Sequence, residues 1–176
     1  MAAPFGMRNN NTPAEHEAAR ETHRQVLTFA LGAETYGVDI LRLKEIRGWS
    51  PVTRLPHSPP AVLGVLNLRG VVVPIIDLRV RFGMPAAEFT KVTVIIVLSL
   101  STATGDQEFG IVVDRVMDVV DVAADQIKPS PATGCAATAG AIEGIATVDD
   151  QMLILLEAER LIFSEPPAAA LSQDAA

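Results

Sequence analysis

The sequence is poor in cysteine and in long apolar runs, and each shortage excludes a class of protein. Its one cysteine, Cys135, cannot form an internal disulfide or a cysteine-pair metal site. The most apolar stretch, residues 92–100, is far shorter than the roughly 18 residues that a membrane span requires. Residues 1–24 are polar and contain no apolar signal-peptide core. We therefore expect a cytoplasmic protein without direct membrane insertion.

The sequence also lacks the usual signs of nucleic-acid binding and of catalysis. Its net charge is −7, with 21 acidic residues against 14 basic ones, which argues against a partner rich in phosphates. The three histidines, His16, His23 and His57, have no second histidine or cysteine at metal-ligand spacing. No nucleophile elbow, phosphate loop or dinucleotide fingerprint is present. We expect a non-enzymatic protein without a metal, a cofactor or a nucleic-acid partner.

Aromatic residues make up only 5% of the chain, so the core must be built from valine, isoleucine and leucine. β-Branched residues favour strands, and many short apolar runs between glycine and proline turns are typical of a sandwich or barrel. The fold class is therefore predicted to be mainly β with short helices. The expected strands are residues 25–31, 35–39, 52–55, 61–68, 71–77, 92–100, 108–120, 144–148 and 151–156. The expected helices are residues 77–82 and 157–163.

Two blocks of the sequence occur twice in the same order. Tyr36-Gly37-Val38 is similar to Phe109-Gly110-Ile111, and residues 64–77 are similar to residues 144–157. Chance similarity between valine-rich strands is one explanation. Duplication is the other, and it predicts two barrels packed side by side. In that interpretation residues 1–23 and 164–176 are flexible tails around a body of residues 24–163. The first barrel covers about 35–90 and the second about 91–163, with strand 25–31 bridging them.

Residues 67–70, Asn-Leu-Arg-Gly, have two interpretations. In the first, Gly70 permits a tight hairpin corner and Arg69 is merely exposed. In the second, Arg69 pairs with the carboxylate of Glu45, because an arginine–carboxylate fork can lock one element against another. The residues alone leave both open. The apolar row within residues 41–46 is likewise either core or part of a groove that binds a helix.

Residues 64–79 resemble the signature block of the CheW family of chemotaxis coupling proteins. Further similar segments follow the family's order, at 36–40, 45–48, 109–114, 118–119, 126–129 and 144–156. The resemblance covers about residues 25–163. It implies two five-stranded SH3-like barrels without a catalytic site or cofactor. It also implies a function, which is to connect the regulatory domain of the CheA histidine kinase to the cytoplasmic tips of chemoreceptors.

The resemblance also assigns expected roles to single residues. Glu45, Arg69 and Asn67 are expected to support receptor coupling, either by contact or by holding a groove rigid. The apolar groove contacts with the receptor are expected to be Leu43, Val65 and Val113. The kinase-facing residues are expected to be Ile127 and Lys128.

Two alternatives stay open at this stage. The chain could serve a non-flagellar chemosensory pathway such as twitching motility, which would keep the fold and change the partners. It could instead be a small-ligand-binding barrel, which predicts exposed aromatic residues around a pocket. Only Trp49 and Tyr36 are available for that role.

Overall fold

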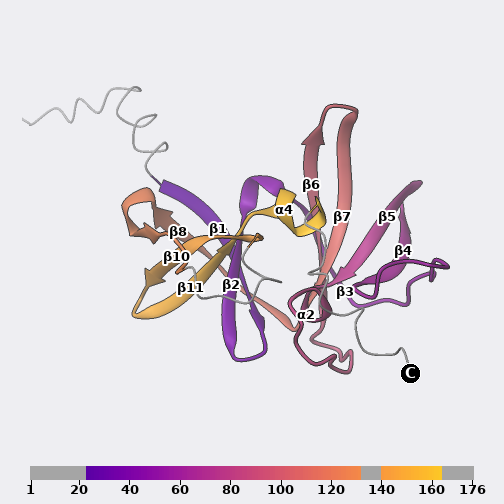
Figure 1. The fold of residues 1–176 in the computed structure, drawn as a ribbon, viewed down its shortest axis with the longest axis horizontal. Coiled ribbons are helices and arrows are strands. Elements are labelled where there is room, and N and C mark those ends of the chain that lie inside the picture. Colours follow the sequence, from indigo (N-terminus) through magenta and orange to yellow (C-terminus); the bar gives the residue numbers. More distant parts are fainter. Residues whose placement is uncertain (1–22, 132–139, 164–176) are drawn as a thin grey trace, which may run out of the picture.

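The structure, a computed structural model, describes residues 23–131 and 140–163 (Figure 1). The predicted tails, residues 1–23 and 164–176, lie outside the described residues except for His23, and Cys135 lies outside them as well. His23 was predicted to belong to the N-terminal tail, and it is instead the first residue of β1.

The described residues form two β-sheets, in agreement with the predicted mainly β fold class. The six-stranded sheet has the order β8 (Arg115–Ala123), β1 (His23–Leu31), β2 (Glu34–Asp39), β11 (Gln151–Leu156), β10 (Ile142–Val148) and β9 (Ile127–Lys128). The five-stranded sheet has the order β3 (Leu43–Gly48), β6 (Val94–Thr102), β7 (Gly105–Val113), β5 (Val71–Asp77) and β4 (Val62–Leu68). Short helices join or follow the strands, namely η1 (Ile40–Arg42), α2 (Leu78–Arg81), η2 (Ala124–Gln126) and α4 (Ala158–Phe163).

Three apolar clusters explain why these strands stay together. The largest lies between the sheets and takes residues from β1 and β2 on one side and from β6 and β7 on the other, together with Leu78 of α2 and Leu161 of α4. Each sheet also has a smaller cluster of its own. Strand β6 serves two clusters at once, since Ile96 faces the central one and Ile95 faces that of its own sheet. A continuous apolar run, as in β6, is what burial on both faces requires.

The internal repeat is visible in the backbone of the two hairpins. Strands β4 and β5 are followed by α2, and β10 and β11 are followed by α4. Each hairpin has a register shift at the same relative place, before Gly64 in one and before Gly144 in the other. The amide of Asp77 donates to the carbonyl of Ala61 at 2.7 Å. Its counterpart, the amide of Glu157, donates to Ala141 at 2.9 Å.

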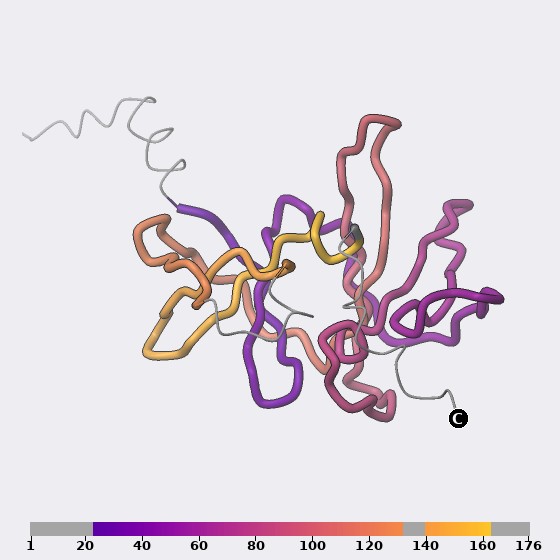
Figure 2. The backbone as a smooth tube through the Cα atoms, viewed as in Figure 1, coloured from indigo at the N-terminus to yellow at the C-terminus, as the bar shows by residue number. Residues whose placement is uncertain are grey.

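The sheets divide the chain differently from the expected barrel boundary near residue 90. Strand β2 pairs in parallel with β11, whereas β7 pairs in parallel with β5. Each sheet therefore takes strands from both halves of the sequence. The chain returns to the six-stranded sheet between β7 and β8, as Figure 2 shows. Local sequence patterns do not encode such pairings, because they join segments far apart in the chain.

Two strand predictions were wrong in detail. The predicted strand 52–55 is absent, and Thr53 instead forms an isolated bridge to Val65. The predicted run 108–120 is broken at Asp114, because its two parts, β7 and β8, belong to different sheets. The two predicted helices are present as α2 and α4, each slightly shorter than expected.

Candidate functional site

The turn between β4 and β5 presents Arg69 to solvent. Arg69 has a φ of 53° and Gly70 a φ of 89°, so both occupy the left-handed region that two-residue hairpin turns require. The side-chain carbonyl of Asn67 accepts a hydrogen bond of 2.8 Å from the amide of Gly70. This bond closes the turn, so Asn67 acts on its shape. The side chain of Arg69 is 89% exposed.

Arg69 and Glu45 are brought together, as one of the two sequence interpretations expected. The Nη2 atom of Arg69 lies 3.3 Å from Oε2 of Glu45. Glu45 belongs to β3, and β3 and β4 are the two opposite edges of the five-stranded sheet. The ion pair therefore spans from one edge of that sheet to the hairpin at the other. It is a single contact and not the two-point fork that the sequence interpretation had in view.

A break in the strand register lies beside Glu45. The register between β3 and β6 shifts between Leu43 and Glu45. Bulges commonly re-aim side chains next to functional sites. Arg47 lies 3.8 Å from the other carboxylate oxygen of Glu45, so two guanidinium groups share one carboxylate. Glu45, Arg47 and Arg69 together therefore carry a net charge of +1.

Two exposed valines follow Arg69 and complete a surface that we name the hairpin tip, residues 67–72. Val71 is 47% exposed and Val72 is 63% exposed. Arginine is enriched at protein interfaces, and the buried core of an interface is more apolar than the rest of the protein surface. The sequence interpretation did not single out either valine, because it predicted residues 71–77 only as a strand. Their position at the very start of the strand was the available signal.

The predicted groove residues have different environments. Leu43 is half-buried and packs against the central cluster. Val65 is also half-buried, and its backbone is occupied on both sides, by Pro74 of β5 and by Thr53. Val113 is 1% exposed and belongs to the central cluster. The side chain of Val113 packs inward between the sheets in this conformation, and its contact with a receptor stays a prediction.

The two residues predicted to face the kinase lie in the other sheet. Ile127 and Lys128 form β9, a short edge strand that pairs only with β10 among the described residues. Ile127 is half-buried against the cluster of the six-stranded sheet, and Lys128 is exposed. The structure therefore separates the predicted coupling residues into two groups, one on each sheet.

Comparison with known proteins confirms the resemblance. The family profile described as "CheW-like domain" matches residues 25–165. The chain is 42% identical over 151 residues to the chemotaxis protein CheW of Klebsiella aerogenes, covering 86% of this chain and 89% of that protein. It is 32% identical over 155 residues to the chemotaxis protein CheW of Bacillus subtilis, covering 88% of this chain and 97% of that protein.

A solved structure agrees with these sequence matches. The crystal structure of the scaffolding protein TtCheW from Thermoanaerobacter tengcongensis is similar with a TM-score of 0.70 and 32% sequence identity. The similarity covers 78% of this chain and 91% of that one. Since the profile and the relatives each span most of the described residues, the chain belongs to the family of CheW-like proteins.

Proposed function

We propose that this chain is a non-catalytic adaptor that couples chemoreceptors to the histidine kinase CheA in chemotaxis signalling. The observation that carries the proposal is the match to CheW proteins over nearly the whole folded body. The partners are the cytoplasmic tip of a chemoreceptor and the regulatory domain of the kinase. The adaptor works in the cytoplasm and reaches the receptor array through these partners.

The separation of the candidate residues supports an adaptor with two docking surfaces. Arg69 and Glu45 lie on the five-stranded sheet, and Lys128 lies at the edge of the six-stranded sheet. A chain that holds one partner on each surface makes the second binding event intramolecular. The effective concentration of the second partner then rises, and the assembly becomes tighter than either contact alone.

The exposure of Arg69 supports a direct contact more than a structural role. An ion pair between a side chain that is 89% exposed and one that is 29% exposed is screened by solvent. Such pairs typically contribute about 0–1 kcal/mol to stability. Most of the guanidinium surface is free to meet an acidic group of a partner, because Glu45 contacts only one of its nitrogens. We therefore assign Arg69 to the docking surface.

No helix among the described residues is both long enough and apolar enough to cross a lipid bilayer.

The experiment measures binding of the full chain to a receptor tip fragment and to the kinase regulatory domain, together with kinase autophosphorylation. Arg69→Ala should weaken binding to one of the two partners at least tenfold and reduce kinase activation. Arg54→Ala is the matched control, since Arg54 is an exposed arginine of the neighbouring loop with no ion pair to another described residue. The role of Arg69 is refuted when both variants bind and activate as the unchanged chain does.

The assignment of the kinase-facing residues has its own test. Lys128→Ala should weaken binding to the kinase regulatory domain and leave binding to the receptor fragment unchanged. Lys91→Ala is the control, because Lys91 is also exposed and lies outside the strands. Failure of the chain to bind either partner at all would overturn the adaptor function itself.

A further inference from the structure

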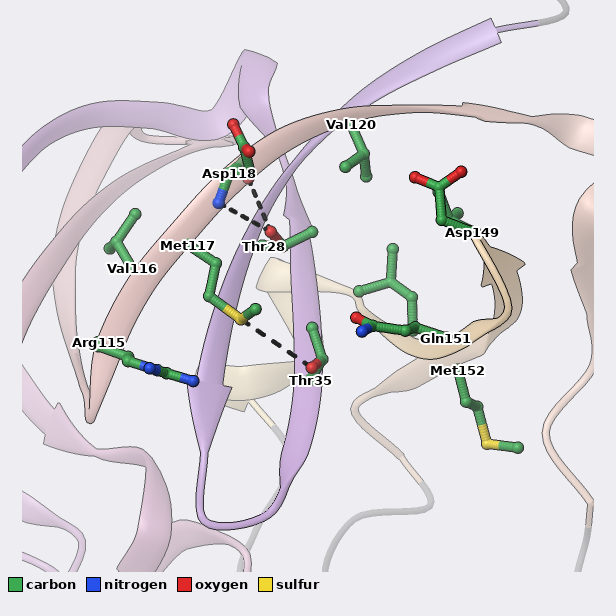
Figure 3. A pocket seen from close by; sticks show the side chains of 12 residues that line it. Thr28, Thr35, Arg115, Val116, Met117, Asp118, Val120, Asp149, Gln151 and Met152 are labelled. Atoms are coloured by element: carbon green, nitrogen blue, oxygen red, sulfur yellow. Dashed lines mark hydrogen bonds between the residues drawn. The ribbon is translucent and has the colours of Figure 1, made fainter.

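A cleft of about 430 Å³ opens beside the hairpin β10–β11 of the six-stranded sheet (Figure 3). Strand β8 lines one side and the hairpin lines the other, with Thr28 of β1 and Thr35 of β2 between them. Val120, Val148 and Leu153 line the cleft and also belong to the apolar cluster of this sheet. The cleft is thus a continuation of that cluster that side chains do not fill.

A β-bulge shapes the wall that β8 contributes. Leu27 pairs with Val119 and Phe29 pairs with Val116, so Thr28 faces two residues of β8 instead of one. The Thr28 hydroxyl makes two hydrogen bonds to the backbone of Asp118 at this bulge. It donates to the carbonyl of Asp118 at 2.8 Å and accepts from the amide of Asp118 at 3.0 Å. Bulges of this kind re-aim neighbouring side chains.

Met117, one of the two bulged residues, extends into the cleft toward Thr35 (Figure 3). The Thr35 hydroxyl lies 4.0 Å from its sulfur. Met152 lines the cleft from β11. Both methionines are exposed, by 42% and 61%. Methionine side chains are flexible and polarizable and make favourable contacts with aromatic rings, so a pair of them forms an adaptable apolar site.

The charges of the cleft are placed at opposite ends. Arg115 stands at one end and Asp149 at the other in Figure 3, with Met117 and Gln151 between them. Neither Arg115 nor Asp149 forms an ion pair with another of the residues that the structure describes. A third charged residue, Asp118, also lines the cleft, and its carboxylate accepts a hydrogen bond of 3.1 Å from the amide of Val119. The cleft therefore offers the positive group of Arg115 at one end and the negative group of Asp149 at the other, on either side of an apolar centre.

We propose that this cleft binds a peptide segment of a partner protein in which one long apolar or aromatic side chain is flanked by an acidic and a basic residue. The apolar side chain lies between Met117 and Met152, the acidic residue meets Arg115, and the basic residue meets Asp149. The volume suits such a segment, because ligand sites typically enclose about 300–1,000 Å³. The site is distinct from the hairpin tip and does not rest on the proposed function.

The test uses a phage-displayed library of random dodecapeptides, selected on the immobilised full chain. We expect enrichment of peptides with an aromatic or long aliphatic residue between opposite charges. Met152→Glu should weaken the enriched peptides at least tenfold. Val92→Glu is the matched control, since Val92 is 64% exposed, lies outside the hairpin tip and does not line the cleft. Val92→Glu should leave peptide affinity unchanged.

Two further measurements decide the result. The double variant Arg115→Glu, Asp149→Lys should select peptides with the opposite order of charges. Methionine methyl NMR should show the Met117 and Met152 signals moving on peptide addition while the Met84 signal stays, and it needs no substitution. The proposal is overturned when no peptide is enriched, when enriched peptides bind Met152→Glu as tightly as the unchanged chain, or when the two methyl signals do not move.

Discussion

Arg79 holds Asp114 through two charge-assisted hydrogen bonds at the point where the chain leaves the five-stranded sheet. The Nε of Arg79 donates to Oδ1 at 2.8 Å, and its Nη2 donates to Oδ2. The amide of Gly32, in the turn between β1 and β2, donates to Oδ2 at 2.8 Å. One carboxylate thus joins α2, the crossover from β7 to β8 and a turn of the six-stranded sheet. Asp114 therefore connects the two sheets through its hydrogen bonds.

Because Asp114 joins these elements as an ionised carboxylate, the folded protein should lose stability in acid. The hydrogen bonds from Arg79, followed by that from Gly32, lower the pKa of Asp114 below its ordinary value, against an opposing effect of burial. Because the pKa is lower in the folded state, the ionised carboxylate adds stability above the unfolded pKa of about 3.9. That contribution disappears as the pH falls through the folded pKa. Asp114→Asn should lower the free energy of unfolding at neutral pH by about 1–2 kcal/mol, allowing for solvent screening.

Urea unfolding of both chains across the acid range checks this expectation. The difference between the unchanged chain and Asp114→Asn should be full at neutral pH and should shrink toward zero well below the ordinary aspartate pKa of about 3.9. Asp121→Asn serves as the control, because Asp121 is exposed. A difference that is constant with pH would contradict the role of the charge.

The Arg69–Glu45 pair should contribute little to folding. A double-mutant cycle of Arg69→Ala and Glu45→Ala, followed by thermal or urea unfolding, should give a coupling energy of about 1 kcal/mol or less. Added salt should reduce it further, because both groups are reached by solvent. A coupling energy of several kcal/mol would mean that the pair holds the sheet edges together. A loss of partner binding in Arg69→Ala would then be explained by a destabilised fold and not by a lost contact with the partner.

The sequence was sufficient for elements whose pattern is local. The hairpin around Arg69 and Gly70 carries its turn chemistry in the sequence, and α2 begins after Asp77, whose side chain accepts from the amide of Arg79. Burial raises the pKa of Asp77, although hydrogen bonds from the backbone amides of Val80 and Arg79 act to lower it. The turn and the helix start were predictable because neighbouring residues alone determine them.

The sequence could not predict that each sheet takes strands from both halves of the chain. Asp114 interrupts an apolar run that looks continuous, and only the distant partners Arg79 and Gly32 explain why the chain turns there. The inward direction of Val113 has the same origin, since it depends on the sheet that packs over it. The sequence did not predict the cleft, because the shape of the cleft depends on Thr28 lying opposite a bulge that is 90 residues away in the sequence.

Gly37 should be intolerant of any side chain. A Cβ at this position would lie 2.4 Å from Cγ1 of Val26, inside the cluster of the six-stranded sheet. Gly37→Ala should therefore lower the free energy of unfolding by about 1–3 kcal/mol, which is the usual cost of overpacking. Gly48→Ala is the control, since a Cβ there would meet no atom within 4 Å. Thermal unfolding of both variants measures the contrast, and equal stabilities would contradict the packing argument.

Thr28 should matter more than Thr35, although both hydroxyls lie at the same cleft. Thr28→Val keeps the shape of the side chain and removes both hydrogen bonds to the backbone of Asp118, so we expect a loss of about 1–2 kcal/mol in unfolding free energy. Thr35→Val removes only a weak contact of 4.0 Å to the Met117 sulfur and should change stability by less than about 0.5 kcal/mol.

The methyl NMR signal of Met117 separates a local effect at the bulge from a general loss of stability. Without the Thr28 hydroxyl, the bulge loses its internal bridge and the Met117 side chain loses its fixed direction, so its signal should shift or broaden in Thr28→Val. The Met84 signal should remain unchanged, because Met84 packs against the central cluster and does not line the cleft. Equal losses of stability in the two threonine variants, or an unmoved Met117 signal in Thr28→Val, would show that the hydroxyl does not shape the cleft.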